Sequence, residues 1–154
     1  MHVLFRNAEI TDLPVLTGLV EALYTEDPSP RQPTPDHTRL TFAQFEKYPE
    51  KGRIQMFEVA GKAVGYALLV HFWSNEYGGN KIIIDEIFVQ PEYRGKGIAR
   101  LFFRYLEQEY PLPAVALELE VTPDNHAARR LYESAGFRLA KNKYFNKLIR
   151  HAND

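Results

Sequence analysis

The first half of the chain combines a strand-like run with two stretches of helical spacing. Residues 2–8 are predicted to form an opening strand, and residues 11–26 a helix with Thr11 as its N-cap. The apolar positions of that helix recur three, four and seven residues apart: Leu16, Leu19, Val20 and Leu23. The proline-rich residues 27–36 cannot continue either element, so they predict a loop, and residues 37–48 predict a second helix.

Strand-like runs dominate the middle of the chain. Residues 53–73 contain two of them, separated by Ala60-Gly61-Lys62, which is a hairpin signal. A turn at residues 75–81 precedes an apolar run at residues 82–89. The helix that follows the next turn has an apolar stripe predicted to face the sheet: Ile98, Leu101, Phe102, Tyr105 and Leu106.

The last third continues the alternation of strands and helices. Residues 114–121 alternate between apolar and polar positions, as a half-buried strand does, and residues 123–136 predict a helix that ends at Gly136. Residues 137–149 predict one or two final strands. Hairpins in the first half and helical crossovers in the second predict an α/β (α+β) fold with a mixed sheet of six to seven strands flanked by about four helices, in a single domain over residues 1–154.

Composition excludes several classes of protein. At 154 residues, with 45% hydrophobic and 25% charged side chains, the chain has the balance of one globular domain. Its net charge of -1 disfavours a general nucleic-acid binder, which would be distinctly basic. The lack of cysteine excludes disulfides, thiolate zinc sites and a cysteine nucleophile. We recognise no signal peptide and no apolar run of membrane length, so a cytoplasmic protein is expected.

A sharp turn in residues 89–100, VQPEYRGKGIAR, carries the clearest chemical signal. The chain leaves a buried strand, exposes Arg94-Gly95-Lys96-Gly97 and enters a helix at once. The first turn of a helix has unpaired N–H groups and the positive end of the dipole, and glycine permits close approach of a ligand. The combination favours a pyrophosphate site; the alternative is an exposed basic face on a tight turn.

Two familiar phosphate-binding motifs fit this turn poorly. A P-loop needs Ser or Thr beside its Gly-Lys pair to hold magnesium, and here Gly97 and Ile98 follow. A dinucleotide fingerprint usually has an acidic residue at the end of the next strand, where this chain has Val121-Thr122-Pro123. Neither motif is favoured.

Two segments resemble the GNAT superfamily of N-acetyltransferases. The turn contains the Arg-x-x-Gly-x-Ala pattern of that family's acyl-CoA loop, at Arg94, Gly97 and Ala99. A second signature, NHAARRLYESAGF, matches at Asn125, Ala128, Leu131, Tyr132, Gly136 and Phe137. The two occur in the family order, separated by a strand, and the predicted elements fit the family's fold over nearly the whole chain.

The resemblance implies acetyl-CoA as the cosubstrate. In such a loop the backbone N–H groups bind the CoA pyrophosphate, the preceding strand end pairs with the pantetheine arm, and the Val89 N–H polarises the thioester carbonyl. Asn125 corresponds to a position that hydrogen-bonds the pantetheine from the other side. The implied cofactor-binding residues are Ile87, Phe88, Val89, Arg94, Gly95, Lys96, Gly97, Ile98, Ala99, Arg100 and Asn125.

Direct transfer of an acetyl group to an amine requires a proton donor and a base. Tyr132 occupies the family's general-acid position, although its apolar helical stripe also suits a core residue. Asp85 and Glu120 are the candidate bases, with Glu86 or a water chain as alternatives. Because side chains alternate along a strand, at most one of Asp85 and Glu86 is expected to face the cleft.

The expected acceptor is a small-molecule primary amine, either an alkyl amine or a polyamine. Residues 64–89 resemble the spermidine/spermine acetyltransferases, which places Glu26 and Asp27 toward a polycation. His71, Phe72 and Trp73 then form either an aromatic wall or strand-end packing. A protein N-terminus, a lysine or an aminoglycoside are alternative acceptors. A non-catalytic acyl-CoA sensor and a nucleic-acid module are the competing classes.

No metal site, membrane contact or specific nucleic-acid partner is expected. The five histidines lack metal-ligand spacing. Exposed edge strands make a homodimer the expected assembly.

Overall fold

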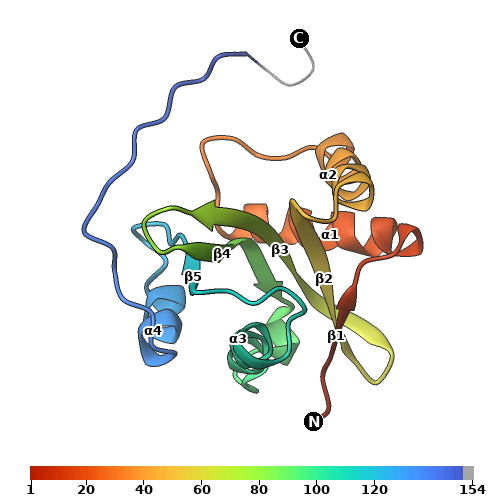
Figure 1. The fold of residues 1–154 in the computed structure, drawn as a ribbon. Helices are drawn as coiled ribbons and strands as arrows, with labels where there is room; N and C mark the ends of the chain where they lie inside the picture. The colour runs from red at the N-terminus through yellow and green to blue at the C-terminus, as the bar shows by residue number, and fades with distance from the viewer. Residues whose placement is uncertain (151–154) are drawn as a thin grey trace.

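One mixed β-sheet organises the chain in the computed structural model, which describes residues 1–150 (Figure 1). Its strands lie in sequence order: β1 (Leu4–Asn7), β2 (Gly52–Val59), β3 (Lys62–Ser74), β4 (Gly79–Val89) and β5 (Ala116–Leu119). Strands β1 to β4 pair antiparallel, and β5 runs parallel to β4. A parallel pair needs a crossover connection, and helix α3 supplies it.

Helices cover both faces of this sheet. They are α1 (Leu13–Glu26), α2 (Pro35–Lys47), α3 (Ile98–Gln108) and α4 (His126–Ser134), with short 3-10 turns at Ile10–Asp12 and Pro91–Tyr93. Figure 1 shows α1 and α2 on one face and α3 and α4 on the other. The mixed α/β architecture with four helices confirms the predicted fold class.

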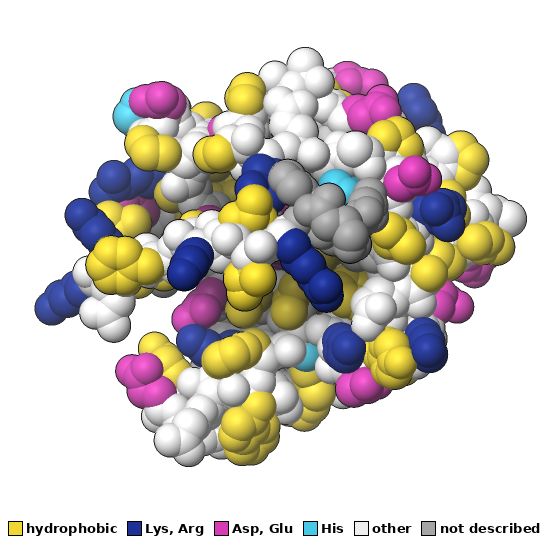
Figure 2. Space-filling view, turned by 90° about the horizontal axis from the view of Figure 1, so that it is seen from above, with side chains coloured by type: hydrophobic (Ala, Val, Ile, Leu, Met, Phe, Trp, Pro, Cys, Tyr) yellow, Lys and Arg dark blue, Asp and Glu magenta, His cyan; other side chains and the backbone are white. Residues whose placement is uncertain are grey.

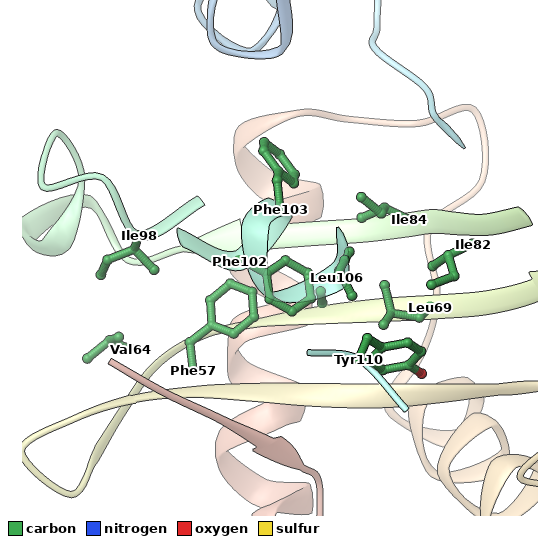
Figure 3. Packing of buried hydrophobic residues seen from close by; sticks show 11 residues of the cluster. Phe57, Val64, Leu69, Ile82, Ile84, Ile98, Phe102, Phe103, Leu106 and Tyr110 are labelled. Atoms are coloured by element: carbon green, nitrogen blue, oxygen red, sulfur yellow. The ribbon is translucent and has the colours of Figure 1, made fainter. Parts of the chain in front are cut away.

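Each face has its own apolar core. On the α3 side, Phe102, Phe103 and Leu106 pack onto sheet residues such as Ile82 and Ile84 (Figure 3). A second cluster lies between the sheet and helices α1 and α2, with members including Leu16, Phe42, Met56, Tyr66 and Phe88. The sheet is therefore buried on both faces along β2, β3 and β4. Among residues 1–150, no helix has both the length and the apolar composition needed to span a bilayer.

The strand count differs from the prediction. Five strands form within residues 1–150, because the segment predicted as the final one or two strands, residues 137–149, runs extended without a pairing partner. A strand-like sequence pattern shows that a segment is suited to a sheet. The segment becomes a strand only when a neighbouring strand offers free hydrogen-bonding groups. The outer edge of β5 is not paired by any described residue.

Two smaller predictions are also wrong. Thr11 lies within the first 3-10 turn, and Asp12 is the residue that precedes α1; the Asp12 carboxylate binds the Arg6 guanidinium at 2.7 and 2.8 Å. Leu101 is 40% exposed, while Phe103 is buried. Helix α3 contacts α4 as well as the sheet, so its apolar stripe extends further round the helix than a stripe facing a sheet alone.

Candidate active site

A cleft opens where β4 and β5 part. Their register ends at the pair Ile84 and Leu119. Beyond this pair, the second half of β4 has no neighbour on its β5 side within residues 1–150. A cleft of about 470 Å³ lies there, walled by the end of α1, residues 84–87 of β4, residues 119–123 and helix α4.

A β-bulge shapes the β4 wall of this cleft. Leu69 pairs with Ile84 and Leu68 with Glu86, so Asp85 is an extra residue without a partner on β3. A bulge shifts the alternation of side chains by one position. As a result Asp85 and Glu86 both line the cleft, which corrects the expectation that only one of them would.

The two adjacent carboxylates have different surroundings. Glu86 accepts hydrogen bonds from the hydroxyls of Tyr24 at 2.7 Å and Tyr66 at 2.9 Å. Burial raises the pKa of Glu86, and these two hydrogen bonds oppose the rise. Asp85 makes no side-chain hydrogen bond to any described residue. Burial raises its pKa, and the nearby charge of Glu120 raises it further. Asp85 is therefore the carboxylate whose oxygens remain available to a ligand.

Two further acids complete the lining. Glu120 follows β5 and accepts a long hydrogen bond of 3.4 Å from the Tyr144 hydroxyl. Asp27, directly after α1, accepts hydrogen bonds from Thr122 at 2.7 Å and Asn125 at 3.0 Å, which tie the segment after β5 to the end of α1. The lining contains four carboxylates and no Lys, Arg or His. Its electrostatic potential therefore favours a cation.

Tyr132 of α4 forms part of the opposite wall. Its ring packs edge-on against Phe103 and Phe137, with centroids 6.2 and 6.1 Å apart. Its hydroxyl makes no hydrogen bond to a described residue. The hydroxyl oxygen is accessible to solvent, so it is not a buried polar atom without a partner. Burial and the charge of Asp27 raise the pKa of Tyr132, so its phenol stays protonated. The side chain thus packs as a core residue and presents an accessible hydroxyl to the cleft.

The glycine turn lies between the open half of β4 and helix α3. Gly95 and Gly97 have φ of 72° and 82°, a region that side-chain-bearing residues rarely adopt. Nothing lies within 4 Å of the position that a Cβ would take at either glycine, so the space beside the turn is open. Gly97 is the N-cap residue of α3 and supplies no side-chain cap, which leaves the first N–H groups of the helix unpaired by a capping group.

The basic side chains of the turn bind protein groups. Arg94 donates to both carboxylate oxygens of Glu26 at 2.7 Å, and its Nε donates to the Val89 carbonyl oxygen at 2.7 Å. Lys96 donates to the Glu92 carbonyl oxygen at 2.9 Å, and Arg100 to Ser134 at 2.7 Å. These contacts hold the turn against α1 and α4. The predicted anion site therefore depends on backbone N–H groups more than on these charges.

The other predicted binding residues have mixed placements. Ile87 and Asn125 line the cleft, and the Asn125 carboxamide oxygen accepts from the Ala128 N–H at 3.1 Å, which caps α4. Phe88 is buried on the α1 side of the sheet, so it contributes only backbone to the cleft side. Ile98, the first residue of α3, is buried in the core between this helix and the sheet, and Ala99 packs against the same core. Val89 ends β4 next to the turn.

Of the two alternatives for His71, Phe72 and Trp73, the structure does not support an aromatic wall of the cleft. His71, Phe72 and Trp73 do not line the cleft; His71 hydrogen-bonds Tyr110 at 2.8 Å, and the other two are largely exposed near the far end of β3.

Sequence reasoning missed Tyr24 and Tyr66, which hold Glu86. A buried acid needs donors, and tyrosines on the neighbouring helix and strand were the available signal. Within residues 1–150, no group of three or more His, Asp or Glu is placed to hold a metal ion.

Comparisons with known proteins identify the family. The acetyltransferase (GNAT) family model matches residues 17–137. An "uncharacterized N-acetyltransferase" of Archaeoglobus fulgidus is 35% identical over 91 residues, which cover 58% of this chain and 62% of that protein, somewhat less than two thirds of its length.

Solved structures show the same fold. A possible acetyltransferase from Clostridium difficile 630 superposes with a TM-score of 0.80 and 24% identity, covering 97% of this chain and 100% of that one. AAC(6')-Iy, solved with the bisubstrate analogue CoA-S-monomethyl-acetylneamine, superposes with a TM-score of 0.72 and 18% identity, covering 96% of this chain and 99% of that one. Since the family model spans most of the sequence, this chain belongs to the acetyltransferase (GNAT) family.

Proposed function

We propose that this protein transfers an acetyl group from acetyl-CoA directly to a primary amine, within a ternary complex. The favoured acceptor class is an alkyl amine or polyamine. One observation carries the proposal: the cleft between the diverging ends of β4 and β5 combines an accessible tyrosine hydroxyl with four carboxylates, beside a glycine turn at a helix N-terminus.

The glycine turn fits the diphosphate of CoA. Gly95 and Gly97 leave open space where a Cβ would lie, and the first N–H groups of α3 are free to donate to phosphate oxygens. The open edge of residues 85–89 can pair with an extended amide-containing chain such as pantetheine. Family membership supports the same donor, and AAC(6')-Iy shows that a protein of this fold holds a CoA analogue.

The side chains of the cleft can manage the two protons of the reaction. A thioester supplies an already activated acetyl group, so placing it beside the amine provides much of the acceleration. An alkyl ammonium has a pKa of about 10 and must lose a proton before attack. Asp85 is the proposed base because its carboxylate makes no hydrogen bond to a described residue and because burial raises its pKa. Tyr132 is the proposed donor to the departing thiolate.

The charge of the cleft supports a cationic acceptor. Asp27, Asp85, Glu86 and Glu120 all line it, without a basic residue among them. A protonated amine is attracted to such a site before it reacts, whereas an acidic acceptor is repelled. In this proposal Glu120 and Asp27 attract the cation, and Glu86 supports the β4 wall through its two tyrosine contacts.

Release of free CoA thiol tests the proposal. The purified protein is incubated with acetyl-CoA and a panel of monoamines, diamines, polyamines, aminoglycosides and peptides with free N-termini. We expect turnover with at least one alkyl amine or polyamine, and kcat/KM that rises with the number of positive charges on the acceptor. Tight acetyl-CoA binding without turnover of any amine would instead support a sensor. Turnover confined to peptides would support a protein acetyltransferase.

A further inference from the structure

We infer that the protein acetylates itself, with the side-chain amine of Lys143 as the acceptor. Lys143 belongs to residues 138–150, called the C-terminal arm below, which follow α4 and contribute to the lining of the cleft. The inference rests on the proposed function, because it names one acceptor for the same cleft. Four features of the arm carry it: its position, its freedom to turn, its charge and its reach.

The position of the arm places a lysine beside the cleft. Tyr144 of the arm lines the cleft, and its hydroxyl donates to the Glu120 carboxylate at 3.4 Å. Lys143 comes directly before Tyr144, so the Cα atoms of the two residues are about 3.8 Å apart. The other lysines of the arm, Lys141 and Lys147, are each about 10 Å from Tyr144 along an extended chain. Lys143 is therefore the amine that needs the smallest displacement to enter the cleft.

Little holds the arm in one orientation. It runs extended after α4 (Figure 1), and its backbone makes no hydrogen bond to another described residue. Its one side-chain hydrogen bond among described residues is the long one from Tyr144. Side chains alternate along an extended chain, so the exposed Lys143 points away from the side that Tyr144 occupies. A half turn of the arm about its own axis exchanges the two side chains, and it breaks only that one hydrogen bond.

The arm and the cleft have opposite charges. Residues 138–150 contain five Lys or Arg and no Asp or Glu. The cleft lining has four carboxylates and no Lys, Arg or His. Figure 2 shows basic and hydrophobic side chains along the projecting arm, which a hollow separates from the body. The attraction that the cleft exerts on a free ammonium group therefore acts on Lys143 as well.

The arm begins next to the proposed proton donor. Phe137, the residue before the arm, packs against the Tyr132 ring with the two centroids 6.1 Å apart. The chain from Phe137 to Lys143 reaches at most about 20 Å when it is extended. A short flexible tether of this kind gives an effective concentration on the order of millimolar. At micromolar protein concentration, transfer within one chain is therefore expected to be faster than transfer between two chains.

The reaction follows the same steps as transfer to a free amine. The Lys143 ammonium gives a proton to the Asp85 carboxylate, and its neutral nitrogen attacks the carbonyl carbon of the thioester. An amide bond forms between Nζ and the acetyl carbon while the C–S bond breaks, and Tyr132 protonates the departing thiolate. Of the two protons that the nitrogen loses, one restores Tyr132 and the other is released to solvent. The products are CoA thiol and an uncharged acetyl-lysine.

Mass spectrometry of the purified full chain tests the inference. The protein is incubated with acetyl-CoA that carries an isotopically labelled acetyl group, which separates new acetylation from any acquired before purification, and peptide mapping locates the label. We expect one labelled acetyl group per chain, on Lys143, with a rate constant that does not change with protein concentration. A rate constant that rises with protein concentration would overturn transfer within one chain. Label on a different lysine of the arm would overturn the assignment to Lys143.

Two variants and an internal control separate enzymatic transfer from spontaneous acetylation. Lys143→Arg keeps the positive charge and removes the reactive amine, so the label on the arm should disappear. Lys51 is an exposed lysine outside the arm and the cleft lining, and it reports the spontaneous rate in the same sample. Tyr132→Phe should slow the labelling of Lys143 toward that of Lys51, by up to about 10³-fold, and leave Lys51 unchanged. Equal rates at Lys51 and Lys143 in the parent protein would overturn the inference.

The amine panel distinguishes failure of this inference from failure of the proposed function. Turnover of a free amine without label on the arm would overturn self-acetylation alone. Absence of both thiol release and label would overturn the proposed function, and the inference with it. A saturating concentration of the best free amine should slow the labelling of Lys143, because both acceptors use one cleft. Labelling of Lys143 at an unchanged rate would show that it is acetylated elsewhere, and it would overturn the inference.

Discussion

The two halves of β4 differ in their neighbours and in their composition. Residues 81–84 pair with β3 on one side and β5 on the other, and Ile82 and Ile84 are buried in the α3 core. Residues 86–89 pair with β3 alone, and Glu86 and the bulged Asp85 before it both line the cleft. The bulge at Asp85 separates the halves. A single strand thus contributes to the core where both of its edges are satisfied, and to a binding site where one edge is left open.

The difference predicts that substitutions beside the open half reduce activity, while those in the paired half reduce stability. The largest effect is expected at Tyr132, which faces the open half. Tyr132→Phe keeps the ring that packs on Phe103 and Phe137 and removes the hydroxyl. Loss of a general acid lowers kcat by about 10³-fold. Steady-state kinetics with the best amine of the panel measures this.

Tyr105→Phe is the matched control for that substitution. Tyr105 packs in the same core cluster and its hydroxyl makes one long contact of 3.4 Å to Gln55, but it does not line the cleft. Because this hydroxyl lies outside the cleft, its removal should leave kcat within about twofold. Equal losses at both tyrosines would show that a packing defect, and not the missing proton donor, explains the result.

In the paired half of β4, Ile82→Ala should lower the stability of the protein. Ile82 is fully buried between β3, β5 and α3, and truncation of such a side chain costs about 3 kcal/mol of the free energy of unfolding. Urea unfolding measures the change. The kcat of the folded fraction should stay close to that of the parent protein. A drop in kcat as large as that of Tyr132→Phe would remove the distinction between the two halves.

The sequence predicts the paired half better than the open one. The apolar run of the paired half is a local pattern. So are the hairpin at Ala60-Gly61 and the helix end at Gly136 elsewhere in the chain, and the structure confirms them. The bulge at Asp85 is not a local pattern, because it depends on the register that β3 imposes. Strict alternation along β4 therefore misplaced the acids, and the partners of Glu86 stayed hidden because they come from other elements.

Dependence on a distant neighbour also explains why the strands predicted over residues 137–149 are not formed. Residues 137–149 have a strand-like composition, but nothing local to a segment states whether a neighbour is present to pair with it. The two family-like motifs were recognisable because each is contiguous. Arg94 was identified correctly as part of the turn, whereas its contact with Glu26 joins residues 68 positions apart.

Asp85→Asn tests the base that we propose in the open half. We expect kcat/KM to fall by about 10²-fold, the lower end for loss of a general base. In the parent protein, activity should decline as the pH falls through the raised pKa of Asp85, since the protonated carboxyl cannot accept the proton of the amine. The Asn variant should lose this acidic limb. A pH–rate profile of kcat/KM from pH 4 to 9 checks both results.

Asp85→Asn should lower activity without lowering the stability of the fold. Its pKa is higher in the folded than in the unfolded chain, so any stabilisation is present at low pH and is lost as the pH rises through the folded-state pKa. At pH 7 the Asn variant should therefore be at least as stable as the parent. Glu107→Gln, which removes an exposed carboxylate on α3 outside the cleft lining, is the neutral control for charge removal. A 10²-fold loss in Glu120→Gln together with an active Asp85→Asn would assign the base to Glu120 instead.

The smallest effect is expected at the glycine turn, where the open half leads into α3. Gly97→Ala places a Cβ at φ of 82°, which costs about 1 to 2 kcal/mol of backbone strain, and it enters the open space that we propose for the diphosphate. Gly61→Ala is the matched control, because Gly61 has φ of 74° and equally open surroundings but lies in the hairpin turn between β2 and β3. Both variants should lose similar stability in urea unfolding, whereas only Gly97→Ala should raise the KM for acetyl-CoA, by about tenfold or 1.4 kcal/mol. If the two variants lose stability equally and leave that KM unchanged, the turn is merely a tight connection, and the diphosphate must bind elsewhere along the open edge.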